Sequence, residues 1–216
     1  MPSSQRTILA YGDSNTHGTC PKTSLQDSRR LDRHERWPGI LAAALGASWQ
    51  VIEEGLPART TVHPDPVSGV HKNGLAVLPA VLESHRPIDL VILMLGTNDL
   101  KARFALPAVE IVSCVEQLLR CVQTSGTGPQ AGAPGLMLVA PPLVKQRGCL
   151  AEIYQGAEPK SAALAGGLAE LAQRYRLPFV NAAGLIAASD IDGVHFDAEA
   201  HRILGGAIAQ AVPEWP

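Results

Sequence analysis

Short β-rich runs alternate with helical patterns along the whole chain, and this alternation constrains the fold more than any other feature of the sequence. The runs typical of strands are Thr7–Tyr11, Val51–Glu53, Leu90–Leu95, Leu136–Ala140 and Phe179–Val180. Apolar residues three or four apart predict helices over 37–45, 75–82, 109–122, 164–175 and 203–211. Asp197 is placed to cap the last helix. Repeated alternation of this kind predicts an α/β fold with helices on both faces of a parallel sheet.

The third run, Leu90–Leu95, is apolar throughout, as expected of a central strand that is buried on both faces. With 216 residues, of which 46% are hydrophobic, the chain can bury one core, and we predict a single domain over residues 1–216. The expected architecture is a three-layer α/β/α domain with a flavodoxin-like five-stranded parallel sheet in the order 2-1-3-4-5. The long links follow strands, so they should gather at the carboxyl edge of the sheet, where ligands bind.

Charge and cysteine content exclude several classes of protein. Eighteen basic and twenty acidic residues give a net charge of −2, which offers no attraction for nucleic acid or an anionic membrane surface. No apolar run is long enough to span a bilayer, and the first residues lack the pattern of a signal peptide. Four cysteines without metal-binding spacing indicate a reducing compartment, so we expect a cytoplasmic protein.

Two polar segments should meet at the carboxyl edge. The sequence Gly12–Asn15 directly follows the first strand and exposes Ser14 on a tight turn, although Gly-Asp-Ser is also ordinary turn chemistry. Asp192 stands three residues before His195, so its carboxylate could hold the imidazole Nδ1–H and leave Nε2 free to face a hydroxyl. A metal pair or a surface turn is the alternative. A metal would need more ligands, and the nearest candidate, His201, is expected to point outward from the last helix.

The ends of the second and third strands add hydrogen-bond donors. In the expected strand order, Gly55 and Asn98 stand on either side of Ser14. A glycine N–H and an asparagine amide are suitable donors for an oxyanion hole, with the Ser14 N–H as a third. Taken singly, Gly55 could merely end a strand and Asn98 could form an Asx turn. Together with Ser14, Asp192 and His195 they predict a nucleophile, a base and oxyanion donors at one edge.

These four segments resemble the sequence blocks of the SGNH hydrolases, or GDSL esterases, in the family's order over residues 12–195. The resemblance implies Ser14 as nucleophile, His195 as base and Asp192 as its partner. It also implies Ser14, Gly55 and Asn98 as oxyanion donors. The segments EEGLPARTT, MLGTNDLKARF and DGVHF are similar to the arylesterase/acyltransferase branch. That similarity implies transfer of small acyl groups to water, alcohols or peroxide, and assembly into a homo-oligomer.

Several side chains near these blocks are candidates for substrate binding. Asn15 stands where the family name has Leu, and His17 adds a second polar group beside it, so both are expected to affect the acyl pocket. His17 could also compete as base, but no carboxylate stands at a matching spacing to orient it. Lys101 and Phe104 follow Asn98 and either line the pocket mouth or belong to a plain loop.

The sequence therefore predicts a serine esterase that hydrolyses short-chain aryl or alkyl esters through an acyl-enzyme, with acyltransferase or perhydrolase ability. Its expected partners are small-molecule esters, and it should need no metal or organic cofactor. A carbohydrate acetylesterase and a non-catalytic binding protein with the same fold remain as alternatives. The loops Thr19–Arg36 and Leu143–Pro159 should control access of water, and exposed apolar residues there would favour an oligomer.

Overall fold

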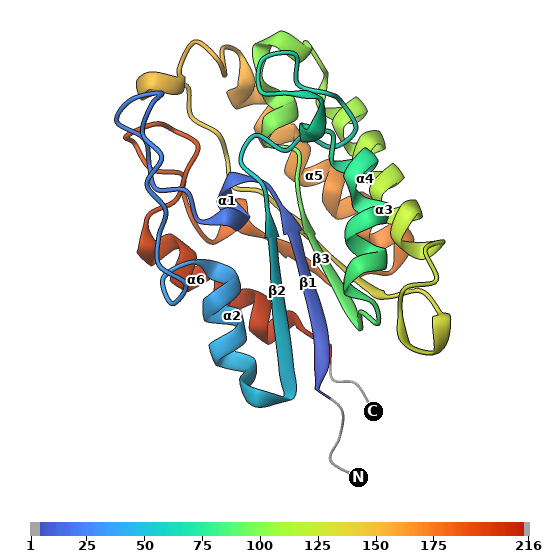
Figure 1. The fold of residues 1–216 in the computed structure, drawn as a ribbon. Coiled ribbons are helices and arrows are strands. Elements are labelled where there is room, and N and C mark those ends of the chain that lie inside the picture. Colours follow the sequence, from blue (N-terminus) through green and yellow to red (C-terminus); the bar gives the residue numbers. More distant parts are fainter. Residues whose placement is uncertain (1–4, 214–216) are drawn as a thin grey trace.

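A five-stranded, all-parallel sheet in the order β2-β1-β3-β4-β5 forms the centre of the computed structural model, which describes residues 5–213 (Figure 1). The strands are β1 (Arg6–Gly12), β2 (Trp49–Gly55), β3 (Leu90–Met94), β4 (Gly135–Ala140) and β5 (Phe179–Asn181). Each of the five predicted runs forms a strand, and the predicted order is confirmed. Every residue of β3 is buried, as its uniformly apolar sequence predicts.

Helices cover both faces of this sheet (Figure 1). They are α1 (Ser14–His17), α2 (Trp37–Leu45), α3 (Gly74–His85), α4 (Ala108–Gln123), α5 (Ala157–Tyr175) and α6 (Ala198–Ala211). Helices α2 and α6 pack on one face, and α3, α4 and α5 on the other. The three-layer α/β/α architecture predicted from the alternation is thereby confirmed.

The alternation of side chains along β1 divides the core between these two faces. Ile8 and Ala10 point toward α2 and α6, whereas Leu9 and Tyr11 point toward α3, α4 and α5. All four side chains are fully buried, because successive residues of a strand face opposite sides of a sheet that is covered on both. The carboxyl end of β1 is therefore fixed between two cores, and the residues that follow it start from a rigid base.

Local capping explains where the helices next to the site begin. Asp13 caps α1 by accepting a hydrogen bond from the Asn15 N–H at 2.9 Å, and Gly18, with φ of +83°, ends this single helical turn. Ser14 is thus the first residue of a short helix, where the sequence predicts only a tight turn. Asp197 caps α6 through the Ala200 N–H at 2.9 Å, as predicted.

The prediction that His201 points outward from the last helix is wrong. His201 is fully buried, and its Nδ1 accepts a hydrogen bond from the Trp37 N–H at 3.2 Å, at the start of α2. His201, Leu204 and Ile208 follow one another at helical spacing and form the buried face of α6. The imidazole occupies that face because it supplies an acceptor for an N–H that opens a helix.

None of the helices within residues 5–213 combines the length and the apolar composition that a bilayer span requires.

Candidate active site

Ser14, His195 and Asp192 meet at the carboxyl edge of the sheet. Ser14 opens α1 directly after β1, and the other two lie on the loop between β5 and α6. The His195 Nε2 atom lies 3.0 Å from the Ser14 Oγ atom, although the residues are 181 positions apart in the sequence. The His195 Nδ1 atom lies 2.6 Å from Asp192 Oδ2. These contacts have the order and lengths of a nucleophile, a base and an orienting carboxylate.

The Asp192 carboxylate is fully buried and held by backbone donors on both oxygens. Its Oδ1 accepts from the N–H groups of Val194 and His195, each at 2.9 Å. Its Oδ2 accepts from the Lys22 N–H at 2.7 Å, from the loop between α1 and α2. Burial acts to raise the pKa of this carboxyl group, but the hydrogen bond and charge of His195, together with the backbone donors, lower it to about 2. Asp192 therefore stays ionised at neutral pH beside the imidazole.

Two glycines let α1 pack closely against the strand ends. A Cβ on Gly12 would lie 2.0 Å from Thr16 Oγ1 and 2.9 Å from the Met94 carbonyl oxygen. A Cβ on Gly55 would lie 2.2 Å from the His17 backbone nitrogen. Either contact is far inside van der Waals distance, so only glycine at both positions allows this seating of α1 and hence of Ser14.

The structure does not bring Gly55 to the pocket as an oxyanion donor. The next residue, Leu56, donates its N–H back to Gly12 of β1 at 3.1 Å. Since successive N–H groups of an extended strand point to opposite sides, the N–H of Gly55 points away from β1 and from Ser14. Gly55 instead supports α1, while Ala58, three residues later, lines the pocket beside Ser14 and Asn98.

Ala58 has an unusual backbone. Its φ is +66°, in the left-handed region that favours glycine. Within residues 5–213, the N–H groups of Ala58 and Ser14 donate to no other protein group. Two backbone donors at one pocket wall are what an oxyanion requires. Sequence reasoning missed Ala58, because nothing in an alanine predicts a positive φ.

Asn98 lies at the same pocket, in the short 3₁₀ turn Asn98–Leu100 after β3. Its Nδ2 donates to the Arg59 carbonyl oxygen at 3.0 Å and lies 3.4 Å from Asp13 Oδ2. Its Oδ1 accepts from the Tyr154 hydroxyl at 3.3 Å. Both protons of the amide nitrogen therefore have an acceptor, and the longer hydrogen bond, to Asp13 Oδ2, is the one that a ligand oxygen in the pocket would have to replace.

The pocket has a volume of about 200 Å³ and joins the side chains of Ser14, Asn98 and His195. An apolar part of its wall comes from Leu25, Pro57, Ala58, Leu150 and Ile153. A polar part comes from Thr19, Lys22, Ser68, Lys101 and Tyr154. The loops Thr19–Arg36 and Leu143–Pro159 both contribute to the wall, so they lie where the sequence predicts that access to the site is controlled.

Lys101 reaches the pocket wall as predicted, and it is buried with a partner. Its Nζ atom lies 3.0 Å from Asp65 Oδ2, and Arg103 Nη1 lies 2.9 Å from Asp65 Oδ1. Burial acts to raise the pKa of Asp65, but the N–H groups of Val67 and Ser68 and the Lys101 ammonium hold it well below its usual range. This ion pair fixes the Lys101 ammonium at the pocket.

Three other predicted substrate-binding residues do not line the pocket. Asn15 is buried and its Nδ2 donates to the Val194 carbonyl oxygen at 3.1 Å. The His17 Nδ1 atom lies 3.2 Å from Thr19 Oγ1, and burial, with the nearby arginine charges, lowers the pKa of His17 to about 4. The Phe104 ring lies 6.0 Å from the His63 ring. Side-chain direction, which depends on neighbours distant in sequence, separates these residues from the pocket.

Two buried carboxyl groups connect the loops beneath the site. Asp99 accepts from the Thr61 N–H at 3.0 Å and from the Thr61 hydroxyl at 2.5 Å, which ties the loop of Ala58 to the loop of Asn98. Burial raises the pKa of Asp99 to about 7. Burial also raises the pKa of Asp13, against the opposing effects of the Asn15 N–H and the His195 charge.

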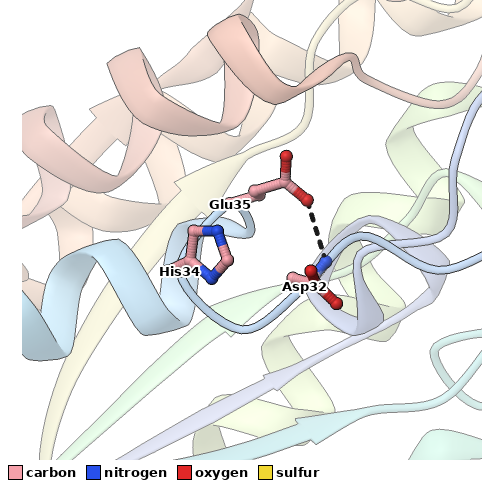
Figure 2. Close-up of side chains that lie close together, drawn as sticks. All are labelled: Asp32, His34 and Glu35. Atoms are coloured by element: carbon pink, nitrogen blue, oxygen red, sulfur yellow. Dashed lines mark hydrogen bonds between the residues drawn. The ribbon is translucent and has the colours of Figure 1, made fainter.

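A separate cluster of Asp32, His34 and Glu35 lies in the loop before α2 (Figure 2). Their possible ligand atoms all lie within 4.8 Å of one another. Figure 2 shows Glu35 bonded to Asp32, whose backbone N–H donates to Glu35 Oε2 at 3.0 Å. That bond closes the turn that leads into α2, and none of the three residues lines the pocket of Ser14.

Comparisons with known proteins agree with this geometry. A model of the GDSL-like lipase/acylhydrolase family matches residues 10–203. The native aryl esterase of M. smegmatis is 39% identical, with a TM-score of 0.90 over 96% of this chain and 98% of that chain. The carbohydrate acetylesterase Est24 from Sinorhizobium meliloti is also 39% identical, with a TM-score of 0.91 over 96% and 98% of the two chains. No curated protein matches the chain.

Proposed function

Because the chain belongs to the GDSL-like lipase/acylhydrolase family and is a carboxylic ester hydrolase of the SGNH type, we propose that Ser14 is its nucleophile, His195 its general base and Asp192 the group that orients His195. The observation that carries this assignment is the continuous contact from Ser14 Oγ through both imidazole nitrogens to Asp192 Oδ2, at 3.0 and 2.6 Å. Proton transfer from Ser14 Oγ to His195 Nε2 therefore needs no further movement of the three groups.

In the proposed mechanism, His195 Nε2 takes the hydroxyl proton while Ser14 Oγ bonds to the carbonyl carbon of an ester. Asp192 stabilises the imidazolium and fixes its tautomer. The N–H groups of Ser14 and Ala58 and the Asn98 amide donate to the developing oxyanion. The carbon–oxygen bond to the alcohol breaks, and His195 returns the proton to the departing oxygen. His195 then removes a proton from a water molecule as its oxygen bonds to the acyl carbon. The bond between that carbon and Ser14 Oγ breaks, His195 returns the proton to Ser14 Oγ, and the acid leaves.

In the proposed set of oxyanion donors, Ala58 takes the role that the sequence predicts for Gly55. Two observations support the exchange: Ala58 lines the pocket, and Gly55 packs under α1. Ala58 holds its positive φ next to Arg59, whose guanidinium donates to the Gly12 carbonyl oxygen at 2.9 Å and lies 4.0 Å from the Tyr11 ring centre. These contacts bind the Ala58 loop to the end of β1, beside Ser14.

Covalent labelling tests the assignment. A fluorophosphonate should add one adduct to the native protein, at Ser14, and abolish the release of p-nitrophenol from p-nitrophenyl acetate. The Ser14→Ala variant should neither label nor turn over, and it should melt at nearly the same temperature as the native protein. A native protein that neither labels nor hydrolyses short-chain esters would support a binding protein with this fold instead.

A carbohydrate acetyl ester is the second candidate substrate. Thr19, Ser68 and Lys101 give the pocket wall hydroxyl and ammonium groups that can bind the hydroxyls of a sugar. Acetate released from acetyl-xylan, compared with p-nitrophenol released from p-nitrophenyl acetate, distinguishes the two substrates. A kcat/KM that is higher for the sugar ester would favour the acetylesterase.

We further propose that the protein is a cytoplasmic homo-oligomer that can also transfer acyl groups to alcohols or peroxide. The side chains of Leu25 and Leu143, on the two loops beside the pocket, are 55% and 41% exposed, which supports a subunit contact there. The four cysteines are free, which suits a reducing compartment. Light scattering tests the subunit number, and product analysis with added alcohol tests transfer.

A further inference from the structure

An asparagine serves as an oxyanion donor only in one of its two amide orientations. Rotation of the Asn98 side-chain amide by half a turn would exchange its NH₂ group for its oxygen. An oxygen turned toward the reacting centre would repel the negative charge that the site must stabilise. Some neighbouring group therefore has to select the productive orientation and keep it through turnover.

The groups on the two sides of Asn98 select the same orientation. The Arg59 carbonyl oxygen can only accept, and Asn98 Nδ2 donates to it at 3.0 Å and to Asp13 Oδ2 at 3.4 Å. On the other side, the Tyr154 hydroxyl lies 3.3 Å from Asn98 Oδ1 and donates to it. The hydroxyl supplies the donor for Oδ1 among residues 5–213. Without it, a buried acceptor would lose its partner, and only the acceptors on the NH₂ side would still hold the amide in this orientation.

Tyr154 is itself fixed and remains a donor. Its side chain is buried, with 3% exposed, and lines the pocket with Asn98, Ser14 and His195. Its N–H donates to the Leu150 carbonyl oxygen at 3.1 Å, and its own carbonyl oxygen accepts from Ala157 at 2.9 Å. Burial, together with the nearby carboxylate charges, raises the pKa of the Tyr154 phenol well above its ordinary value, so the hydroxyl keeps its proton.

A donor on the amide oxygen also strengthens the amide N–H groups. A hydrogen bond to Oδ1 draws electron density away from the nitrogen, and hydrogen bonds in such a chain reinforce one another. The Tyr154–Asn98 contact therefore both orients and polarises the group that faces the oxyanion.

We propose that Tyr154 is a positioning residue of the esterase: its hydroxyl holds the Asn98 amide so that an N–H group points at the oxyanion. This inference rests on the proposed function, in which Asn98 is an oxyanion donor. The Tyr154 hydroxyl then affects kcat only by orienting the Asn98 amide, and it does not contact the reacting atoms.

The Tyr154→Phe variant removes the hydroxyl and keeps the ring. With p-nitrophenyl acetate, kcat should fall about tenfold, the value of one neutral hydrogen bond, while KM changes less than about twofold. In an Asn98→Ala background, Tyr154→Phe should cause no further loss of kcat. Tyr175→Phe is the matched control. It removes a hydroxyl bonded to Glu116 at 2.7 Å, away from the pocket, and should leave kcat unchanged.

The results separate this inference from the proposed function. An equal loss of kcat with and without Asn98 would mean that the hydroxyl contacts the reacting atoms directly, which overturns the positioning role. Unchanged kcat in Tyr154→Phe, with Ser14 still labelled by the phosphonate, would overturn this inference alone. A native protein without phosphonate labelling would overturn both. If the melting temperature of Tyr154→Phe is much lower than that of the native protein, Tyr154→Met removes the same hydroxyl. Its kcat, measured with and without Asn98→Ala, then tests the positioning role in the same way.

Discussion

At the scale of single residues, the conformation of Ala58 connects backbone strain to chemistry. A positive φ costs a residue with a Cβ about 1 kcal/mol, and such strain persists only where the surrounding contacts enforce it. Here Arg59 anchors the loop to β1, and Asp99 anchors it through Thr61. Contacts that lie outside the pocket thus hold the backbone of Ala58, the donor that we propose, at the pocket wall.

Substitutions at Ala58 should distinguish the backbone from the side chain. Ala58→Gly keeps the N–H and accepts the positive φ, so kcat should be retained and stability should change by less than about 1 kcal/mol. Ala58→Val places a β-branched residue in the same conformation and should lower both the melting temperature and kcat. Thermal melts and p-nitrophenyl acetate kinetics measure both effects. Equal activity in the two variants would argue against a fixed Ala58 N–H.

Replacing Asn98 should lower kcat more than replacing Tyr154, whose hydroxyl donates to the Asn98 amide oxygen. Asn98→Ala removes one oxyanion donor, so kcat should fall roughly 10²-fold or more while phosphonate labelling of Ser14 persists at a lower rate. Steady-state kinetics with p-nitrophenyl acetate provide the test. A loss confined to KM would show that the amide binds the ground state only.

The spacing of individual residues predicted some of the site and not the rest. Asp192 and His195 are three positions apart on one loop, so their contact follows from local geometry, and the strand order brings Ser14 to them. The sequence allows Lys101 either at the pocket mouth or in a plain loop, and it cannot predict the pairing with Asp65, because that partner lies 36 positions away on another loop. Burial of a lysine follows from such a partner and is invisible in a sequence pattern.

At the scale of elements, the seating of α1 depends on two glycines at the ends of neighbouring strands. Gly55→Ala retains the backbone N–H but forces a Cβ to within 2.2 Å of the His17 nitrogen. We expect a loss of roughly 1–3 kcal/mol in stability, and a fall in kcat because α1 carries Ser14. Urea unfolding and kinetics measure both. A variant with native stability and native activity would contradict the close packing of α1 on β2.

The contact between α6 and α2 should be sensitive to acid. Burial is the main cause that lowers the pKa of His201 to about 4, while the unfolded chain titrates near its ordinary value of 6.5. Above pH 6.5 the neutral imidazole is present in both states. As pH falls from about 6.5 to about 4, the unfolded chain binds the proton first, so the free energy of unfolding decreases.

The His201→Gln variant keeps an acceptor for the Trp37 N–H but cannot titrate. Its stability should therefore fall less than that of the native protein between pH 6.5 and pH 4, as measured by urea unfolding at several pH values. The exposed His34 provides the control for exchanging a histidine, and His34→Gln should leave the stability at neutral pH unchanged. Parallel profiles for the native protein and His201→Gln would contradict this role for His201.

The apolar spacing predicts where the helices lie more reliably than it predicts which of their residues are exposed. Val109 and Ile203 belong to the predicted apolar spacing, yet they are 67% and 37% exposed. The sequence predicts an outward-pointing side chain for the polar residue His201, yet His201 is buried at the contact with α2. Periodicity predicts that a helix has an apolar face, whereas the partner helix decides which residues at the border of that face are covered.

At the scale of the whole molecule, the long loops that follow the strands all contribute to one edge of the sheet. The loops after β1, β2, β3, β4 and β5 each supply a residue to the site: Ser14, Ala58, Asn98, Tyr154 and His195. The topology therefore assembles the site from five separate segments on a rigid base. The sequence predicts that Ser14, Asn98 and His195 meet at this edge, because they follow strands that are neighbours in the expected order. It gives no signal for Ala58 or Tyr154.

Assembly of subunits should affect the balance between transfer and hydrolysis. If Leu25 and Leu143 lie at a subunit contact, changing both to Lys should reduce the subunit number. The pocket should then admit more water, and the ratio of transferred to hydrolysed acyl groups should fall in the presence of an alcohol. Light scattering and product analysis of the same samples test this. If only the subunit number or only the ratio of transferred to hydrolysed acyl groups changes, assembly does not control acyl transfer.

The hydrogen bond from the Lys22 backbone to Asp192 has a consequence for engineering the entrance. The segment that bounds the opening also holds the carboxylate that we propose orients His195, so remodelling this segment for bulky esters should lower kcat as well as change the fit. Libraries that broaden substrate range should therefore leave the main chain at position 22 intact and vary Leu25, whose side chain lines the opening without touching the acid.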